Sequence, residues 1–291
     1  FEWKVSDRLA LTEATRANLG AVFVLYYDEK HELQSFLDQM NERGPDLVAH
    51  TFDGVTQKVW RVNADPAVTA FFAGKRLYIA DGHHRYRTAH THRDKMRLAE
   101  KPDGPRPYDY VLMGFVALDE PGLFVYPAHR VVEMPAGFDE QKFMNDLSKW
   151  FEVLPVESDL HMHVQDEQEC AFGLALKGGK RFVLRLRDID RVDLLGDSHG
   201  PAWRDLDVSV LHGGILERIL HFPPDAVHVY EKDQAVALDM VENGKKGLAF
   251  LLRNMRPAQV CACAEARESM PQKATYFFPK LPSGAAIYVH R

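Results

Sequence analysis

Residues 77–89 have the sequence Leu-Tyr-Ile-Ala-Asp-Gly-His-His-Arg-Tyr-Arg-Thr-Ala, in which an apolar segment ends at Asp81 and Gly82 turns the chain. A helix is predicted directly after this turn, from His83 to Ala99. The first backbone N–H groups of a helix have no partner within the helix, and the helix dipole adds partial positive charge at the same end. This succession of strand, glycine turn and helix therefore predicts a phosphate site in an α/β protein.

The side chains of the same turn strengthen this prediction. Arg85 can bind phosphate in a bidentate manner, and Gly82 allows an anion to approach the backbone closely. Asp81 could cap the helix, or bind a magnesium ion or a substrate hydroxyl. The alternative is an ordinary capped helix with surface histidines. Because two histidines and an arginine share one first turn, we predict catalytic roles for Asp81, His83 and His84, and phosphate binding by Gly82, His84 and Arg85.

Helices and strands alternate along much of the chain, but predicted hairpins over residues 47–62 and 171–187 interrupt the alternation. We therefore expect an α/β fold of the mixed α+β kind, with mixed sheets and flanking helices. A stretch rich in proline and glycine, residues 121–137, is the predicted boundary. It separates a phosphate-binding lobe of residues 1–120 from a second α+β lobe of residues 121–291.

The composition narrows the class of protein. The chain has 291 residues, of which 46% are hydrophobic, as in an ordinary globular protein. Its formal net charge of −6 argues against a protein that coats nucleic acid without sequence preference. The basic residues gather locally: residues 76–97 hold six Lys or Arg, four His and two acids. Such a patch on an acidic protein suits a small anionic ligand. The three cysteines are too few for a disulfide framework, no apolar run could span a bilayer and no signal peptide is evident, so we expect a cytoplasmic protein.

Two further segments are candidate parts of the site. The segment from Met270 to Lys280 carries Lys273, Thr275 and Lys280 between prolines, and these side chains could reach phosphate oxygens as a second wall. The pair His129-Arg130 could bind a carboxylate or phosphate, with the histidine as a general acid or base. A proline-pinned strand with solvated lysines and a loop-packing pair are the alternatives.

No metal site is predicted. His161-Met162-His163 is interpreted as part of a half-buried strand with its histidines in water. Cys261-x-Cys263 has no second ligand pair nearby, which argues against a zinc site.

The turn itself resembles a known signature. Gly82–Tyr86, followed by Ala89, is similar to the signature of the ParB/sulfiredoxin superfamily, in which such turns bind nucleotide phosphates. The superfamily includes ParB proteins, which bind CTP, sulfiredoxins, which use ATP, and free-serine kinases. Sulfiredoxins carry their reactive cysteine where this chain has His83, so the resemblance implies no thiol chemistry here. The free-serine kinases, which need no thiol, are the closer analogy.

A second resemblance extends over nearly the whole chain. The chain is similar to the bacterial and archaeal family called domain of unknown function 1015, in the segments Asp7–Leu9, Ala14–Asn18, Ile79–Tyr86, Pro127–Arg130 and Met270–Lys280. The last of these is long and specific. Members of the family are typically longer and this sequence begins with Phe, so we expect that a further N-terminal portion precedes it. The family has no settled activity to carry over.

Three functions remain open from the sequence. The first is a phosphotransferase that uses a nucleotide (ATP, ADP or CTP) with Mg²⁺ and acts on a small hydroxylated metabolite such as serine. The second is a nucleotide-binding regulatory switch without turnover, for which a homodimer would be the natural assembly. The third is a nuclease, which the acidic balance disfavours. A small phosphate-bearing molecule is the expected partner, with nucleic acid and membrane disfavoured.

Overall fold

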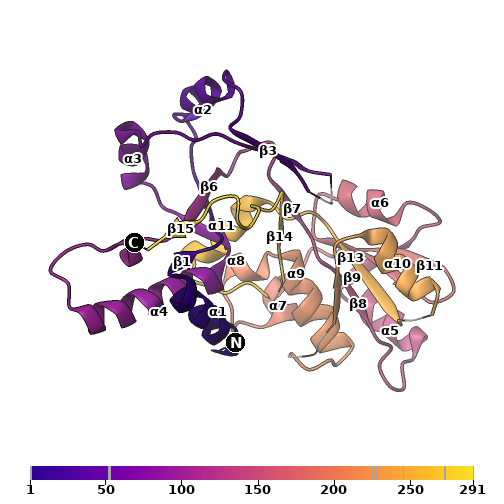
Figure 1. Cartoon of the computed structure of the whole chain (residues 1–291). Coiled ribbons are helices and arrows are strands. Elements are labelled where there is room, and N and C mark those ends of the chain that lie inside the picture. The colour runs from indigo at the N-terminus through magenta and orange to yellow at the C-terminus, as the bar shows by residue number, and fades with distance from the viewer. Residues whose placement is uncertain are drawn as a thin grey trace. The chain divides into compact units, whose positions relative to one another are not determined.

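The computed structural model describes residues 2–51, 54–224, 226, 228–244, 246–271 and 273–290, with the backbone alone for residues 2–5. The chain forms two compact units (Figure 1). The first unit comprises residues 1–123 and 279–291, and the second comprises residues 124–278. The last 13 residues thus group with the first unit, whereas the boundary expected from the sequence places them in the second lobe.

The first unit is built on a three-stranded sheet. Its order is β5 (Tyr78–Asp81), β2 (Val22–Tyr26) and β6 (Met113–Ala117). Strand β2 pairs antiparallel with β5 and parallel with β6, so the sheet is mixed, as predicted. All five residues of β2 are buried, which is expected for a central strand made only of apolar and aromatic residues.

Helices and a hairpin complete this unit. Helix α4 (His83–Glu100) follows β5 directly and packs against α1 (Glu2–Thr15), beside which it lies in Figure 1. The hairpin predicted over residues 47–62 is confirmed by β3 (Leu47–His50) and β4 (Thr56–Val59), although Phe52 and Asp53 at its tip lie outside the described residues. The remaining elements are α2 (Gln34–Asn41), α3 (Pro66–Ala73) and the 3-10 turn η1 (Pro107–Asp109).

The C-terminal tail returns to the first unit through specific contacts. Strand β15 (Tyr288–Val289) pairs antiparallel with β1 (Ala17–Asn18). On β6, Gly114 leaves space for the side chain of Leu281, because a Cβ atom at Gly114 would overlap Leu281 Cδ1. This close approach positions the residue that follows Lys280, and therefore helps to place Lys280 itself.

The second unit contains a six-stranded sheet in which every neighbouring pair is antiparallel. The predicted hairpin over residues 171–187 is confirmed by the pairing of β10 with β11. In spatial order the strands are β12 (Val229–Glu231), β8 (His129–Val132), β13 (Leu248–Leu252), β10 (Ala171–Leu176), β11 (Lys180–Leu186) and β9 (Phe151–Pro155).

Both faces of this sheet are covered, because side chains alternate between the faces along each strand. Phe172 and Phe250 belong to a large cluster with α5 (Glu140–Ser148) and the π-helix η2 (Val210–Ile219). Val131 and Leu251 belong to a smaller cluster with α6 and α10. The other elements of the unit are β7 (Phe124–Tyr126), β14 (Tyr276–Phe278), α6 (Leu160–Asp166), α7 (Arg191–Leu195), α8 (Pro201–Arg204), α9 (Asp207–Ser209), α10 (Gln234–Glu242) and α11 (Pro257–Glu265).

One local prediction is wrong. The segment with His161 and His163 was expected as a half-buried strand, but it lies in helix α6. Leu160 and Val164 are both buried, and residues four apart share one face of a helix as well as one face of a strand. Met162, expected on the same strand face as these two residues, is exposed on the helix.

The fold class predicted from the sequence, mixed α/β with flanking helices, is confirmed. No helix in the described ranges has the length and apolar character that crossing a membrane requires.

Candidate functional site

The Gly82 turn, defined here as Asp81–Arg85, has the local structure that the sequence predicted. Strand β5 ends at Asp81, Gly82 has φ 90° and ψ 21°, and α4 begins at His83. This left-handed conformation favours glycine because a Cβ atom would crowd the following carbonyl oxygen. Gly82 is the N-cap residue and provides no side-chain cap to the first N–H groups of α4. An anion at this position would meet those N–H groups and the positive end of the helix dipole.

Asp81 is a carboxylate held by its neighbours rather than a helix cap. Its Oδ1 accepts a hydrogen bond from the Gly82 N–H at 2.7 Å, and its Oδ2 accepts one from Lys280 Nζ at 3.0 Å. Arg85 Nη2 lies 3.9 Å from the same Oδ2. Burial alone would raise the pKa of Asp81, but the hydrogen bond and charge of Lys280, the hydrogen bond from the Gly82 N–H and the charge of Arg85 together outweigh it, so the pKa lies below its usual value. Asp81 is therefore ionised at neutral pH.

Arg85 packs its guanidinium against the backbone of two glycines. A Cβ atom at Gly82 would lie 2.8 Å from Arg85 Nε, and a Cβ atom at Gly20 would lie 3.3 Å from Arg85 Nη1. The Arg85 side chain is 28% exposed. The absence of side chains at both glycines thus leaves the guanidinium beside the first turn of α4, where a bound phosphate would need it.

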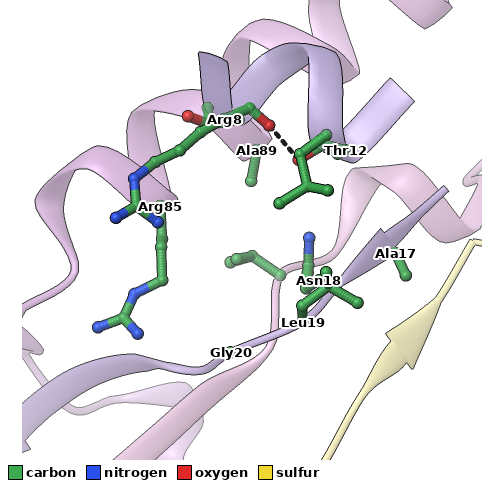
Figure 2. A pocket seen from close by; sticks show the side chains of 11 residues that line it. Arg8, Thr12, Ala17, Asn18, Leu19, Gly20, Arg85 and Ala89 are labelled. Carbon is green, nitrogen blue, oxygen red and sulfur yellow. Dashed lines mark hydrogen bonds between the residues drawn. The ribbon is translucent and has the colours of Figure 1, made fainter. Parts of the chain in front are cut away.

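A small pocket adjoins Arg85 in the first unit. The Arg8–Arg85 pocket has a volume of about 70 Å³ and is lined by α1, α4 and the chain around β1. Figure 2 shows the Arg8 and Arg85 side chains along one side, and Asn18 and Leu19 along the other. Ligand pockets for whole small molecules are typically about 300–1,000 Å³. This pocket is therefore large enough for one small group of a ligand rather than for a complete nucleotide.

Thr88 adds an unexplained polar atom to this pocket. It lies one helical turn after Arg85 on α4, lines the pocket and is 3% exposed. Its hydroxyl oxygen is buried and has no hydrogen-bond partner among the described residues. Buried hydroxyl groups almost always have a partner, so a ligand group at this position would resolve the exception.

The two histidines of the turn differ in their surroundings. His83 is exposed, while His84 is half-buried. Partial desolvation of the ring lowers the pKa of His83. The negative charge of Asp81 opposes this shift, and the positive charge of Arg87 adds to it. His83 is therefore neutral near pH 7 and has a ring nitrogen that can accept a proton.

Arg130, in the second unit, is fully buried and bonded to its own neighbourhood. Its Nε donates to His212 Nε2 at 2.9 Å, and its Nη2 donates to the Lys273 carbonyl at 3.2 Å. The guanidinium carbon of Arg130 and the Lys273 Nζ lie 4.5 and 4.6 Å from the centre of the same Tyr230 ring. Burial lowers the pKa of Arg130 to about 10. Burial and the charge of Arg130 together lower the pKa of His212 to about 3.

His129 is also engaged within the second unit. It is 2% exposed, and its Nδ1 accepts a hydrogen bond from the Leu252 N–H at 3.2 Å. Burial and neighbouring positive groups lower the pKa of His129 to about 4. Thr275 is half-buried beside the buried Ala274. Phosphate binding by His129, Arg130, Lys273 and Thr275 stays a prediction, because the contacts described above serve the packing of this unit.

The structure therefore brings the predicted residues together in two groups. Asp81, Gly82, Arg85 and Lys280 meet in the first unit, and Arg130 and Lys273 meet in the second. The sequence interpretation gave no role to Arg8 and Thr88. Arg8 lies in the first segment that resembles the known family, and Thr88 follows Arg85 by three residues on a helix. Both signals were present in the sequence.

Within the described ranges, no group of three or more His, Cys, Asp or Glu side chains lies together so as to hold a metal ion. Asp81 is the carboxylate of the Gly82 turn, and both of its oxygens already accept hydrogen bonds. Because both Asp81 oxygens are engaged in these hydrogen bonds, a Mg²⁺ ion at the turn would be held chiefly by the phosphate oxygens of a ligand.

Comparisons with known proteins were made for sequence and for structure. The profile of the family described as protein of unknown function (DUF1015) matches residues 1–209. A search among curated proteins gave no match.

Solved structures similar to this chain include a free serine kinase in complex with AMP, at 13% identity and a TM-score of 0.42, covering 97% of this chain and 83% of that one. A conserved hypothetical protein from Pyrococcus furiosus has 14% identity and a TM-score of 0.41, covering 97% and 86%. SbnI from Staphylococcus aureus has 10% identity and a TM-score of 0.41, covering 94% and 75%.

Proposed function

The chain belongs to the DUF1015 family of proteins of unknown function, and on that premise we propose that it binds a phosphorylated ligand at the Gly82 turn. The first candidates are the nucleotides ATP, ADP and CTP. The reaction we propose is transfer of a phosphoryl group to the hydroxyl of a small metabolite such as serine. The observation that carries the proposal is the placement of Arg85 against two glycines beside the uncapped start of α4.

The charges around the turn support an anionic ligand. Arg85 and Lys280 flank Asp81, and Arg8 lines the adjoining pocket. These three cations and one carboxylate leave a surplus of two positive charges. Because Lys280 forms an ion pair with Asp81, its charge offsets the carboxylate, and the two arginines remain to attract phosphate oxygens.

The size of the Arg8–Arg85 pocket indicates how such a ligand would lie. About 70 Å³ accommodates one phosphate-sized group, with the Thr88 hydroxyl as a further hydrogen-bond partner. The rest of a nucleotide would lie outside this pocket. The arrangement therefore favours recognition of the phosphate end, with base and sugar contributing less.

The proposed transfer assigns separate tasks to the residues of the turn. A bond forms between the acceptor hydroxyl oxygen and phosphorus, the bond from phosphorus to the leaving phosphate oxygen breaks, and the hydroxyl proton passes to a protein base. His83 is the candidate for that base because its lowered pKa keeps it neutral, with Asp81 as the alternative. Arg85, His84 and the α4 amides would neutralise the charge on the transferred group. Mg²⁺ would come with the nucleotide and neutralise its phosphate oxygens.

A second candidate function is nucleotide binding without turnover. Both oxygens of Asp81 are engaged by the Gly82 N–H and by Lys280, which limits Asp81 as a base or metal ligand. In this alternative the phosphate contacts would be the same, but no acceptor hydroxyl would be activated. The protein would then act as a nucleotide-controlled regulator.

A thermal-shift screen with ATP, ADP, CTP, pyrophosphate and phosphoserine, each with Mg²⁺, tests the binding proposal. A ligand at one hundred times its dissociation constant adds about 2.7 kcal/mol of stability, which is an easily measured shift. We expect a shift with a phosphorylated ligand that Arg85→Ala abolishes and Arg87→Ala retains, since Arg87 is exposed on the same helix. The absence of a shift with every ligand would reject the phosphate site.

Phosphorus NMR of the protein with the stabilising nucleotide and serine then separates the two candidate functions. A new phosphomonoester signal, absent in Arg85→Ala, would support the transferase. A thermal shift with no product, from serine or from other small hydroxylated metabolites, would favour the binding module.

A further inference from the structure

A second pocket in the first unit shares no lining residue with the Arg8–Arg85 pocket. This His92–His290 pocket has a volume of about 490 Å³, and its lining includes Arg16, His92, Lys95, Arg106, Tyr108 and His290. His92 follows His83 by nine residues on α4, which corresponds to about 13 Å along the helix axis. The pocket is therefore separate from the Gly82 turn, and its volume lies in the usual range for small-molecule sites.

Two histidines of this pocket have ring nitrogens that nothing in the protein explains. His92 is 3% exposed, and its buried Nδ1 has no hydrogen-bond partner within the described part of the chain. Both ring nitrogens of His290 are buried and equally without a partner there. The two rings are stacked, with centres 5.5 Å apart and planes 24° apart. Buried polar atoms in folded proteins are nearly always bonded, so three such nitrogens in one pocket wall indicate a missing partner.

The charged groups of the pocket leave an excess of positive charge. Lys95 is paired with Glu13 at 2.5 Å, and Glu100 accepts a hydrogen bond from the Tyr108 hydroxyl at 2.8 Å. Arg16 and Arg106 line the same pocket, and neither forms a salt bridge with any described residue. Because Glu100 keeps its negative charge, these five groups leave one net positive charge, and the two guanidinium groups without a carboxylate partner favour an anion with oxygen acceptors.

The walls of the pocket also include apolar and aromatic surface. The ring of Tyr108 lies edge-on to His92, with centres 6.5 Å apart, and Met96 and Pro107 also line the pocket. A ligand that only carried charge would leave this surface in water. An organic skeleton with one or more anionic groups would use both parts of the pocket.

We propose that the His92–His290 pocket is a second ligand site, for a small organic anion whose carboxylate or phosphate group binds Arg16 and Arg106. Neutral imidazole nitrogens of His92 and His290 hydrogen-bond its polar atoms, and its skeleton packs against Tyr108. This site goes beyond the proposed function of the Gly82 turn, because the two pockets share no residue and can be tested independently.

The test is an NMR titration of the imidazole ¹⁵N resonances with citrate and, separately, with inorganic pyrophosphate. It is done in the Arg85→Ala variant, so that an anion at the Gly82 turn does not contribute. Saturable shifts of the His92 and His290 signals with citrate would assign a carboxylate ligand, and with pyrophosphate a phosphate ligand. No shift of either histidine with either anion would overturn the proposal.

Matched charge substitutions show whether the anion binds where we propose. We expect Arg106→Gln to weaken binding at least about tenfold and Arg106→Lys to restore part of it. Lys58→Gln removes one positive charge at an exposed position of β4, outside both pockets, and should leave affinity unchanged. An Arg106→Gln variant that retains its melting temperature and binds as tightly as the unsubstituted protein would also overturn the proposal.

Discussion

Lys280 Nζ lies 3.0 Å from Asp81 Oδ2, although the two residues are 199 positions apart in the sequence. The contact brings the segment after β14 back to the Gly82 turn. It gives the turn a second cation beside Arg85 and helps to lower the pKa of Asp81. The pair therefore connects the Gly82 turn with the C-terminal end of the segment from Met270 to Lys280.

Lys280→Met should lower stability in a pH-dependent way. Because Lys280 depresses the pKa of Asp81 in the folded state, its contribution is present above the unfolded pKa of about 3.9 and is lost as the pH falls below that value. The Asp81 side chain is 43% exposed, so solvent screening limits the loss at pH 7 to less than about 1 kcal/mol. Urea unfolding at pH 7 and pH 3 measures it. An equal difference between variant and parent at both pH values would contradict the role of the pair.

Gly82→Ala should destabilise the protein by about 1–2 kcal/mol, because alanine is unfavourable at a φ of 90°. The new methyl group would also lie 2.8 Å from Arg85 Nε, so ligand binding should weaken as the guanidinium moves. Gly74→Ala is the matched control, since Gly74 has φ −103° and a methyl group there would meet open space. Equal melting temperatures for the two variants would argue against strain at Gly82.

Thr88→Val separates packing from binding in the Arg8–Arg85 pocket. Replacing a buried, unpartnered hydroxyl with a methyl group of similar shape should be neutral or slightly stabilising without ligand. The stabilisation by a phosphorylated ligand should decrease, because the proposed hydrogen bond is lost. Thermal shifts with and without ligand test both effects, and a full ligand shift in Thr88→Val would remove Thr88 from the site.

Acid should destabilise the second unit at pH values well above those at which carboxylates titrate. His129 is buried and His212 is half-buried, and both are neutral, with pKa values of about 4 and about 3 in the folded state. Once unfolded, both bind protons near pH 6.5, so stability falls as the pH decreases below that value. Each histidine contributes up to about 1.36 kcal/mol per pH unit. Unfolding free energies measured from pH 7 to pH 5 give the slope.

A variant of one histidine identifies the source of that slope. His129→Gln retains an acceptor for the Leu252 N–H. It should reduce the slope of the unfolding free energy against pH by up to about 1.36 kcal/mol per pH unit, which corresponds to one proton. His163→Gln, at an exposed position of α6, is the control and should leave the slope unchanged. A slope that survives in His129→Gln would assign the acid sensitivity to other groups.

Local sequence signals predicted the parts of the fold that depend on local chemistry. Gly82 marked the left-handed turn because few other residues adopt that conformation. The two hairpins followed from the turn dipeptides Asp53-Gly54 and Gly178-Gly179 between two strand-like runs. The prediction for the segment around His161 failed because Leu160, Met162 and Val164 alternate as in a strand, whereas the segment is helical and Met162 is exposed.

The candidate site was predictable in its residues but not in its pairings. Asp81 and Lys280 were each named from the sequence, yet only the path of the tail past Gly114 brings them together. Arg130 was expected to face a ligand, but one sequence does not show that its donors serve His212 and the Lys273 carbonyl. Burial and long-range contacts decide whether such a side chain binds a ligand or packs within the protein, and the spacing of residues in one sequence predicts neither.

The discontinuity of the first unit has a consequence for the order of events during synthesis. The chain leaves the ribosome N-terminus first, and domains generally fold as they emerge. Residues 124–278, the whole second unit, are translated between the Gly82 turn and Lys280. While the second unit is being synthesised, the nascent first unit contains Asp81 but not yet Lys280. The site is therefore assembled only after the intervening unit has been synthesised.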